Sequence, residues 1–347
     1  MTTQTSSPVL PENSAVLITG AGGAAAVTLI RALTGHARVV AADIDPLAVG
    51  LYLVPAAQRI LLPRGDDPGF VDALLASAVE HRVGLVIPTV DIELRDVSAA
   101  RGRFAEHGIR LLVETTGCLD LCLDKAALVA RCADRVRVPR TVVLSQSTTA
   151  ADLAGLGAPF IVKPRQGAGG RGFAVISEPG DLDRVPHDET MIAQENLPGT
   201  EYSIDVLCRP DGHVVAAVPR TRDKVDSGIA VAGRTVRDAG LESFGRGVAV
   251  AIGATGVINV QARRAVDGAP ALLEVNARFP GTMTLTMLAG IDMPLLGTAA
   301  AFGASLPDRI DFQELAVVRH WADVAVPIDE YGVIGTGPPV ATAAGAP

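Results

Sequence analysis

Three oxygen-bearing side chains in the last third of the chain have the residue types and the spacing of a metal site. Two apolar runs flank Asp267-Gly268, a dipeptide that favours a two-residue type I′ hairpin turn. Pairing across such a turn places Gln261 directly opposite Glu274. Glu274 and Asn276 are two residues apart, so both side chains leave the same face of their strand. One carboxylate and two amide carbonyls suit Mg²⁺, which proteins hold with one or two carboxylates plus substrate phosphates.

The surroundings of this trio decide between a site and an ordinary edge hairpin with solvated polar residues. Ala271, Leu272, Leu273 and Val275 lie among the polar positions, and unpaired polar groups in an apolar setting are costly. This favours a site. Arg278 lies two residues further along the same face and could add a cation there.

A glycine-rich loop between two cations is the second feature with chemical potential. An apolar strand over residues 159–164 ends near Lys163 and runs into residues 165–172, where four glycines fall within six residues before and after Arg171. Backbone N–H groups of such a loop can approach phosphate oxygens closely. The spacing is not that of a P-loop. The alternative interpretation is a flexible β-turn.

Two further acidic positions follow predicted strands near the amino terminus. The strand over residues 15–19 runs into Gly20–Ala25, a Gly-x-Gly-x-x-Ala pattern with Asp43 about twenty residues on, which is the nominal dinucleotide fingerprint. The same pattern recurs wherever a strand must turn tightly into a helix, so it is weak evidence for nicotinamide binding. Glu93 follows the buried strand over residues 84–88, at the end where open α/β sheets bind ligands. It is either a substrate contact or a helix-start acid favoured by the helix dipole.

Composition limits the function classes. Of 347 residues, 48% are apolar and 20% charged, which indicates a packed globular protein. The net charge of −8 disfavours nonspecific binding to nucleic acid or anionic membranes, and 3% aromatic residues are too few for base-stacking platforms. No apolar run reaches the roughly 18 residues of a membrane span, and the first dozen residues do not read as a signal peptide. Four cysteines without a CxxC pair predict free thiols and a cytoplasmic protein.

The ordered set of motifs resembles the ATP-grasp superfamily, in particular its carbamoyl-phosphate-synthetase-like members, from about Val16 to Gly303. Each motif is common, but the series in this order is specific. The motifs are Asp124-Lys125, Ile161-Val162-Lys163-Pro164 with its glycine-rich loop, Glu195 followed by Gly199-Thr200-Glu201, Gln261, and Glu274-Val275-Asn276 with Arg278.

The resemblance implies an α/β protein that is α+β in its second half. Residues 14–117 would form a Rossmann-like pre-ATP-grasp domain, whose glycine turn does not bind NAD; alternating strands and helices in this region independently predict a parallel sheet. Residues 118–310 would form an ATP-grasp fold of two α+β subdomains with the nucleotide between them and a lid over about 134–196. Residues 1–13 are expected to be a disordered tail, and 311–347 a strand followed by a loose tail.

The resemblance also implies roles for individual residues. The expected ATP contacts are Lys125 and Lys163 at phosphates or adenine, Gly169 and Gly170 in the phosphate lid, Glu195 and Leu197 at the adenine hinge, and Glu201 at the ribose. The expected ligands of Mg²⁺, with Mn²⁺ able to substitute, are Gln261, Glu274 and Asn276. Lys163 and Arg278 would act in catalysis, and Glu93, Arg220 and Gly281 would contact the substrate.

Two departures from the carbamoyl-phosphate-synthetase pattern shape the functional expectation. The chain has one ATP-grasp unit instead of two, and Gly281 replaces a second arginine; residues 279–284 instead look like those of single-unit peptide and amino-acid ligases. The resemblance therefore implies a ligase that activates an organic carboxylate as an acyl phosphate and joins it to an amine, releasing ADP and phosphate. A homodimer is allowed. The alternatives are a non-catalytic nucleotide-binding module, a carbamoyl-phosphate-type carboxylate kinase, and an NAD-dependent enzyme.

Overall fold

The computed structural model of the protein describes residues 9–167 and 172–334. These residues form two compact units, each assembled from separate stretches of the chain. The first unit contains the residues up to 116, those from 278 to 307 and those from 320 onward, and the second contains residues 117–277 and 308–319. Of the two tails expected from the sequence, residues 1–8 and 335–347 lie outside the described residues.

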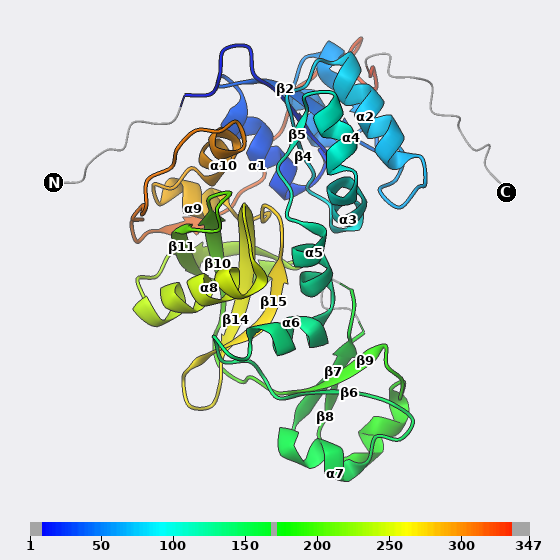
Figure 1. The fold of residues 1–347 in the computed structure, drawn as a ribbon, viewed down its shortest axis with the longest axis vertical. Helices are drawn as coiled ribbons and strands as arrows, with labels where there is room; N and C mark the ends of the chain where they lie inside the picture. Colours follow the sequence, from blue (N-terminus) through cyan, green and yellow to red (C-terminus); the bar gives the residue numbers. More distant parts are fainter. Residues whose placement is uncertain (1–8, 168–171, 335–347) are drawn as a thin grey trace. The chain divides into compact units, whose positions relative to one another are not determined.

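A five-stranded parallel sheet forms the centre of the first unit, in the order β3-β2-β1-β4-β5; Figure 1 labels β2, β4 and β5 of this sheet. This confirms the parallel sheet predicted for this region. The central strand β1 is buried along its whole length, as expected of a strand covered on both faces. The strands are β1 (Ala15–Ile18), β2 (Arg38–Asp43), β3 (Arg59–Leu61), β4 (Leu85–Ile87) and β5 (Arg110–Leu111).

Helices of the first unit come from both ends of the chain. Phe70 and Leu74 of α2 and Phe104 of α4 pack in one core cluster with Leu17 of β1, and α10 contacts α1. The helices are α1 (Ala24–Leu33), α2 (Phe70–Glu80), α3 (Asp91–Ala99), α4 (Arg101–Glu106), α9 (Thr284–Leu288) and α10 (Met293–Ala301), with short 3₁₀ turns η1 (Val49–Leu53) and η2 (Ala56–Gln58).

Two four-stranded sheets and one three-stranded sheet build the second unit. The sheet β6-β9-β7-β8 joins β6 (Thr141–Val143), β7 (Phe160–Pro164), β8 (Ala174–Ile176) and β9 (Met191–Glu195). The sheet β11-β10-β14-β15 joins β10 (Glu201–Cys208), β11 (Val214–Thr221), β14 (Val257–Arg264) and β15 (Pro270–Asn276). The third sheet joins β12 (Lys224–Asp226), β13 (Ile229–Arg234) and β16 (Ala316–Val318).

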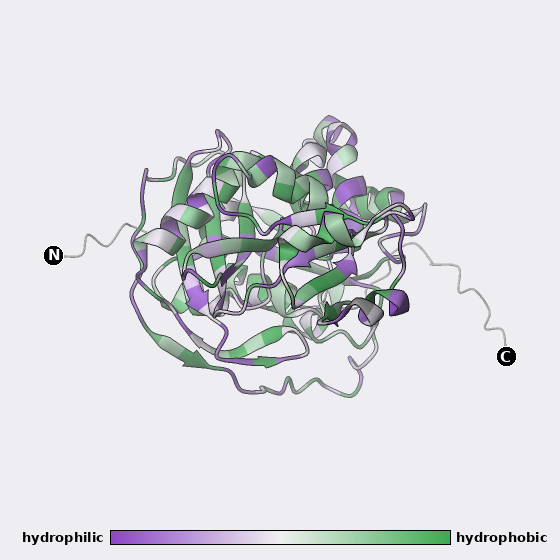
Figure 2. Cartoon of the chain, turned by 90° about the horizontal axis from the view of Figure 1, so that it is seen from below, coloured by the Kyte–Doolittle hydropathy of each residue, from purple (hydrophilic) through white to green (hydrophobic). Residues whose placement is uncertain are grey.

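Helix α8 (Ala239–Ile252) covers one face of the β11-β10-β14-β15 sheet. Its Gly245 lies so close to β10 that an added Cβ would come within 2.6 Å of Ile204 Cγ2. The opposite face of this sheet is polar. Figure 2 shows the hydrophobic residues along the strands and hydrophilic ones on many loops. The other helices of this unit are α5 (Thr116–Leu123), α6 (Lys125–Cys132) and α7 (Ala150–Leu153), with η3 (Ala154–Leu156) and η4 (Pro179–Arg184).

The β14–β15 hairpin corrects one prediction and confirms another. Ala265 N donates to Ala269 O at 2.9 Å, so the loop has three residues and not the predicted two. Gly268 adopts a φ of 80°, which suits the left-handed position of a three-residue hairpin loop. The three-residue loop shifts the pairing next to it by one residue, so that Ala262 pairs with Leu272. A bulge at Leu273 then shifts the register back by one residue. Gln261 therefore pairs with Glu274 as predicted.

Among the described residues the four cysteines form no disulfide, and three of them are buried. Within residues 9–167 and 172–334, no helix has the length and apolar character needed to cross a bilayer.

We predict that the approach of α8 to β10 tolerates no side chain at position 245. Gly245→Val should lower the free energy of unfolding by about 1–3 kcal/mol, because the added atoms overpack a filled interface. Gly117→Val is the matched control, since Gly117 lies in α5 with no heavy atom within 4 Å of an added Cβ; it should change stability by less than about 0.5 kcal/mol. Urea unfolding of both variants measures the difference, and equal stabilities would contradict the packing.

Candidate functional site

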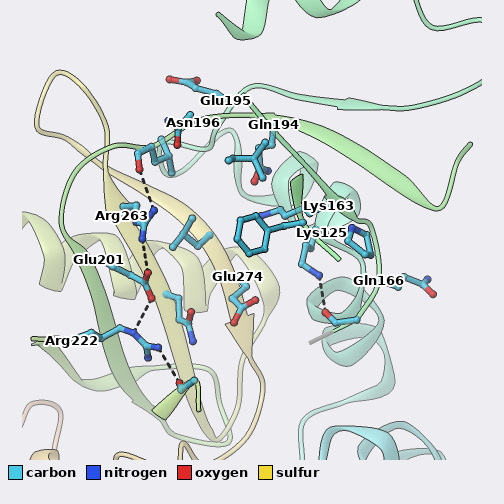
Figure 3. Close-up of a pocket in the computed structure, with 18 residues that line it drawn as sticks. Lys125, Lys163, Gln166, Gln194, Glu195, Asn196, Glu201, Arg222, Arg263 and Glu274 are labelled. Carbon is cyan, nitrogen blue, oxygen red and sulfur yellow. Dashed lines mark hydrogen bonds and ion pairs between the residues drawn. The ribbon is translucent and has the colours of Figure 1, made fainter. Parts of the chain in front are cut away.

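A cavity of about 590 Å³ lies in the second unit, between the two four-stranded sheets (Figure 3). One wall comes from β7, β9 and the neighbouring Gln166, Gly167 and Phe173, and the other from the polar face of β10, β14 and β15. Its lining comprises Lys125, Ile161, Lys163, Pro164, Gln166, Gly167, Phe173, Gln194, Glu195, Asn196, Leu197, Glu201, Arg222, Gly228, Gln261, Arg263, Leu273 and Glu274.

Lysine is rare in this chain, and two of its three lysines line the cavity. The sequence contains Lys125, Lys163 and Lys224 only. Burial and the positive charge of Lys125 lower the pKa of Lys163 from the ordinary 10.5 to about 8. The negative charge of Glu274 acts in the opposite direction. Burial likewise lowers the pKa of Lys125, against the attraction of Glu274 and Asp124. The cavity therefore concentrates positive charge that an anionic ligand would stabilise.

Residues at the start of α6 are hydrogen-bonded to Arg165 and Gly167, which follow β7. The Asp124 carboxylate caps the helix by accepting from Ala126 N and Ala127 N, and both its oxygens accept from Arg165 Nε at 2.9 Å. Lys125 Nζ donates to Gly167 O at 2.7 Å. Gly169 and Gly170, the predicted phosphate-lid residues, lie outside the described residues.

Glu201 is held between two arginines on the polar sheet face. Arg222 Nε lies 2.8 Å from Glu201 Oε1, and Arg263 Nη2 lies 3.0 Å from Glu201 Oε2. Arg222 also donates to Gly228 O at 3.0 Å. Each carboxylate oxygen has two lone pairs, so Glu201 can accept a further hydrogen bond from a ligand.

The far end of the cavity is formed by the segment that follows β9. Glu195 pairs with Arg140 at 3.2 Å and with Arg137 at 3.5 Å, which holds its carboxylate beside the segment that leads into β6. Leu197 is buried and lines the cavity with its apolar side chain. Figure 3 shows Glu195 apart from Glu274, which is drawn between Glu201 and Lys125.

Glu274, Gln261 and Asn276 occur together on the polar face, as the register predicts. Gln261 lies opposite Glu274, and Asn276 lies opposite Asn259. Within the described residues, no group of three or more His, Cys, Asp or Glu side chains could hold a metal ion. A single carboxylate with two amide oxygens is nevertheless a donor set for Mg²⁺ when phosphate oxygens complete the shell.

Arg220, a predicted substrate contact, is buried beneath this face and does not line the cavity. It is 1% exposed, and its Nη2 lies 2.6 Å from Asp205 Oδ1. Arg222, two residues further along the chain, lines the cavity instead. Neither Arg222 nor Arg263 was predicted from the sequence as a site residue. Arg263 is two residues from Gln261 on β14, so strand alternation could have identified it.

Three other predicted residues belong to the first unit. Arg278 makes a two-pronged ion pair with Asp91, with both N–O distances 2.7 Å. Glu93 is buried, and its Oε1 accepts from Thr19 Oγ1, Thr89 N and Val90 N at the start of α3. Burial raises the pKa of Glu93 against these hydrogen bonds. An added Cβ at Gly281 would come 3.2 Å from Ala24 Cβ.

The geometry favours the helix-start interpretation of Glu93, because its carboxylate already satisfies buried donors. Asp43 has a comparable local role: its Oδ2 accepts from Gly22 N at 2.7 Å and its Oδ1 from Asp45 N at 3.0 Å. Such a carboxylate ties the glycine turn to the end of β2. A tight strand-to-helix turn therefore accounts for the fingerprint without a dinucleotide.

Two family models match separate parts of the chain. Residues 187–324 match the model described as "ATP-grasp in the biosynthetic pathway with Ter operon". Residues 16–112 match the model described as "PylC-like, N-terminal domain". The chain therefore has an ATP-grasp domain preceded by a PylC-like amino-terminal domain, which confirms the resemblance and the fold expected from the sequence.

Among curated proteins, a D-alanine–D-alanine ligase of Corynebacterium glutamicum (strain ATCC 13032) is 33% identical over 103 residues. The match covers 28% of this chain and only 29% of the ligase.

Solved structures share the fold at low identity. N5-carboxyaminoimidazole synthetase from Staphylococcus aureus complexed with ADP superposes with a TM-score of 0.73 and 15% identity, covering 89% of this chain and 82% of that one. L-amino acid ligase from Bacillus licheniformis superposes with a TM-score of 0.64 and 18% identity, covering 84% of this chain and 74% of that one.

We predict that Lys163 titrates apart from the other lysines. Protein labelled with [ε-¹³C]lysine should give three NMR signals, and the one removed by Lys163→Arg should titrate with a midpoint near pH 8, because burial and Lys125 disfavour its charge. The exposed Lys224 is the internal reference. Joint titration of all three signals near the ordinary lysine value would contradict the cavity electrostatics.

Proposed function

We propose that this chain, in which an ATP-grasp domain follows a PylC-like amino-terminal domain in the sequence, is an ATP-dependent carboxylate–amine ligase. It activates a small organic carboxylate as an acyl phosphate and joins it to an amine, releasing ADP and phosphate. The observation that supports this most directly is the cavity, which sets two of the chain's three lysines across from a wall bearing Glu274 and Gln261. Cations on one side and metal-type oxygen donors on the other suit the phosphates of a nucleotide.

The residues of the cavity suit a nucleotide in one orientation. The apolar Leu197 and the neighbouring Glu195 suit an adenine ring and its polar edge, while Glu201 has lone pairs left for the ribose hydroxyls. Lys125 and Lys163 then meet the phosphates; Gly169 and Gly170, predicted from the sequence for the same role, lie outside the described residues. The ADP in the Staphylococcus aureus synthetase supports a nucleotide in this fold.

Glu274, Gln261 and Asn276 would hold Mg²⁺, with Mn²⁺ as a substitute. Their donor set fits, since one carboxylate and amide oxygens leave positions for phosphate oxygens. The metal, when bound, neutralises charge on the terminal phosphates. Only Glu274 of the three bears a charge, so it is the ligand whose loss should matter most.

The reaction needs charge neutralisation before it needs acid–base chemistry. A carboxylate oxygen attacks the γ-phosphorus and the bond to ADP breaks, so two anions must approach each other. Protonated Lys163 and Lys125 lower that repulsion by facing the phosphates. The amine then attacks the acyl carbon, the C–O bond to phosphate breaks with its electron pair leaving on phosphate, and the amine nitrogen loses a proton as the amide forms. Water must be kept from the acyl phosphate meanwhile.

We assign Arg278 to anionic groups of the reacting carboxylate or acyl phosphate, with Glu93, Arg220 and Gly281 as weaker candidates for the substrate. The burial of Arg220 with Asp205 and the capping role of Glu93 favour structural roles for those two. Asp91 holds the guanidinium of Arg278 in a fixed plane, which suits recognition of a two-oxygen anion once a ligand competes for it.

Two other functions remain as alternatives. A non-catalytic nucleotide-binding module would have no use for Glu274 facing Lys163, and a carboxylate kinase would stop at the acyl phosphate. We further propose small-molecule carboxylate and amine substrates, a cytoplasmic location consistent with four free thiols, and a homodimer as an allowed assembly.

The acyl phosphate provides the decisive test. With Mg²⁺, ATP and the correct acid but no amine, hydroxylamine should trap a hydroxamate while ADP accumulates, because the cations and metal donors surround the terminal phosphates, where charge develops during γ-transfer. A screen of amino acids for phosphate release identifies the acid. Arg278→Ala should lose hydroxamate formation far more than ATP affinity. Release of AMP and pyrophosphate would contradict the mechanism, and ATP binding without turnover of any acid would favour the non-catalytic module.

We also predict that ATP binding takes up a proton above pH 8. Lys163 has a pKa of about 8, and bound phosphates raise it, so the lysine is already protonated near pH 6.5 but gains a proton on binding near pH 8.5. ATP affinity should therefore fall as the pH rises above 8. Calorimetry in buffers of different ionisation enthalpy measures the uptake.

The controls for this titration separate the cavity from the amino-terminal turn. Lys163→Arg should bind ATP with much less proton uptake near pH 8.5, since arginine stays charged. Asp43→Ala should bind ATP normally, and NAD should not bind detectably. NAD binding that is lost in Asp43→Ala would instead support the dehydrogenase alternative.

A further inference from the structure

A buried row of polar side chains runs behind the proposed metal ligands, across adjacent strands of one sheet. Asp205 on β10 is fully buried, and its Oδ1 accepts from Arg220 Nη2 at 2.6 Å and from Asn259 Nδ2 at 2.8 Å. Asn259 on β14 is 3% exposed. Its Oδ1 accepts from Asn276 Nδ2 on β15 at 3.5 Å. The row thus leads from a buried ion pair to one of the three ligands.

Strand pairing places these residues directly side by side. Asp205 lies opposite Asn259 in the β10–β14 pair, and Asn259 lies opposite Asn276 in the β14–β15 pair. Alternation along each strand keeps all three on the same face. The spacing is therefore set by the backbone ladder and does not depend on the choice of side-chain rotamers alone.

Hydrogen-bond polarity runs in one direction along the row. A carboxylate paired with arginine can only accept, so Asn259 must turn its NH₂ group toward Asp205 and its oxygen away. That oxygen can only accept, so Asn276 must turn its own NH₂ toward Asn259. The Asn276 oxygen then lies on the other side of the amide. Within the described residues this oxygen accepts no hydrogen bond, which leaves it available to a ligand.

We infer, on the premise of the proposed function, that Asn259 is a positioning residue for the metal site. It orients the Asn276 amide so that the oxygen, and not the NH₂ group, is presented to the cation, and the Asp205–Arg220 ion pair is the fixed reference for that orientation. An amide bonded the other way round would present hydrogen atoms to Mg²⁺ and could not ligate it. Partners behind a ligand commonly matter for metal affinity in this manner.

An aspartate at position 276 needs no such orientation, because its two oxygens are equivalent acceptors. This difference gives a test that a merely structural role of Asn259 would not meet. Asn259→Leu should weaken binding of Mn²⁺ about 10–100-fold in the presence of ADP. In the Asn276→Asp background the same Asn259→Leu change should alter Mn²⁺ binding by about twofold or less. Electron paramagnetic resonance of free Mn²⁺ measures both without turnover.

Control variants separate the failure of this inference from the failure of the site. Glu274→Gln should abolish most Mn²⁺ binding; if it does not, the proposed metal site is wrong. If Glu274→Gln weakens binding but Asn259→Leu does not, or weakens it equally in both backgrounds, only the orienting role is wrong. Thr235→Val removes another buried hydrogen bond of the same unit, from Thr235 Oγ1 to Gln313 O, and should leave Mn²⁺ binding unchanged.

A measurement on the unmodified protein covers the case in which Asn259→Leu does not fold. The chain has only four asparagines, Asn13, Asn196, Asn259 and Asn276, so selective labelling resolves their side-chain ¹³Cγ signals. Addition of Mg²⁺ to the ADP complex should shift the Asn276 signal strongly, while Asn259 and the reference Asn13 shift little. An unshifted Asn276 signal, or a larger shift at Asn259, would overturn the inference.

Discussion

The ion pair between Arg220 and Asp205 is the interaction on which the polar face of the second unit depends. Both side chains are buried to within 1% of full burial, so each requires the other: removing one partner of such a pair leaves a buried charge and costs about 3–5 kcal/mol. A solitary buried amide would also be unfavourable. The pair gives Asn259 a charged acceptor, and through Asn259 it reaches Asn276. Polar residues that would destabilise an apolar sheet are thereby tolerated next to the cavity.

Arginine and lysine have different roles in this molecule. Fixed ion pairs use arginine, as at Asp205, Glu201, Asp124 and Asp91, because the planar guanidinium stays charged and binds two oxygens at once. Two of the three lysines face the cavity. A buried ammonium loses its proton more readily and is a compact point charge, so its state responds to an arriving anion. The arginine charges are thus permanent, whereas the charge of the two cavity lysines responds to the ligand.

Hairpin geometry keeps the candidate metal ligands aligned although the turn differs from the simplest form. A three-residue loop with Gly268 in the left-handed region changes the pairing by one position, and the bulge at Leu273 reverses that change. A one-residue slip without the bulge would turn Glu274 to the α8 side of the sheet. The bulge therefore matters for the site itself, which agrees with the tendency of bulges to re-aim side chains near functional centres.

The sequence by itself determined the features that depend on local periodicity: the parallel sheet of the first unit, the common face of Glu274 and Asn276, and Lys163 near the end of an apolar strand. It placed Gln261 opposite Glu274 correctly but from a two-residue turn that the structure does not have. Only the tertiary structure decided between Arg220 and Arg222, which share one face of the same stretch. Their environments differ because Asp205, from a neighbouring strand, buries Arg220, while Glu201 holds Arg222 at the cavity. Such partners are distant in sequence, and strand alternation cannot identify them.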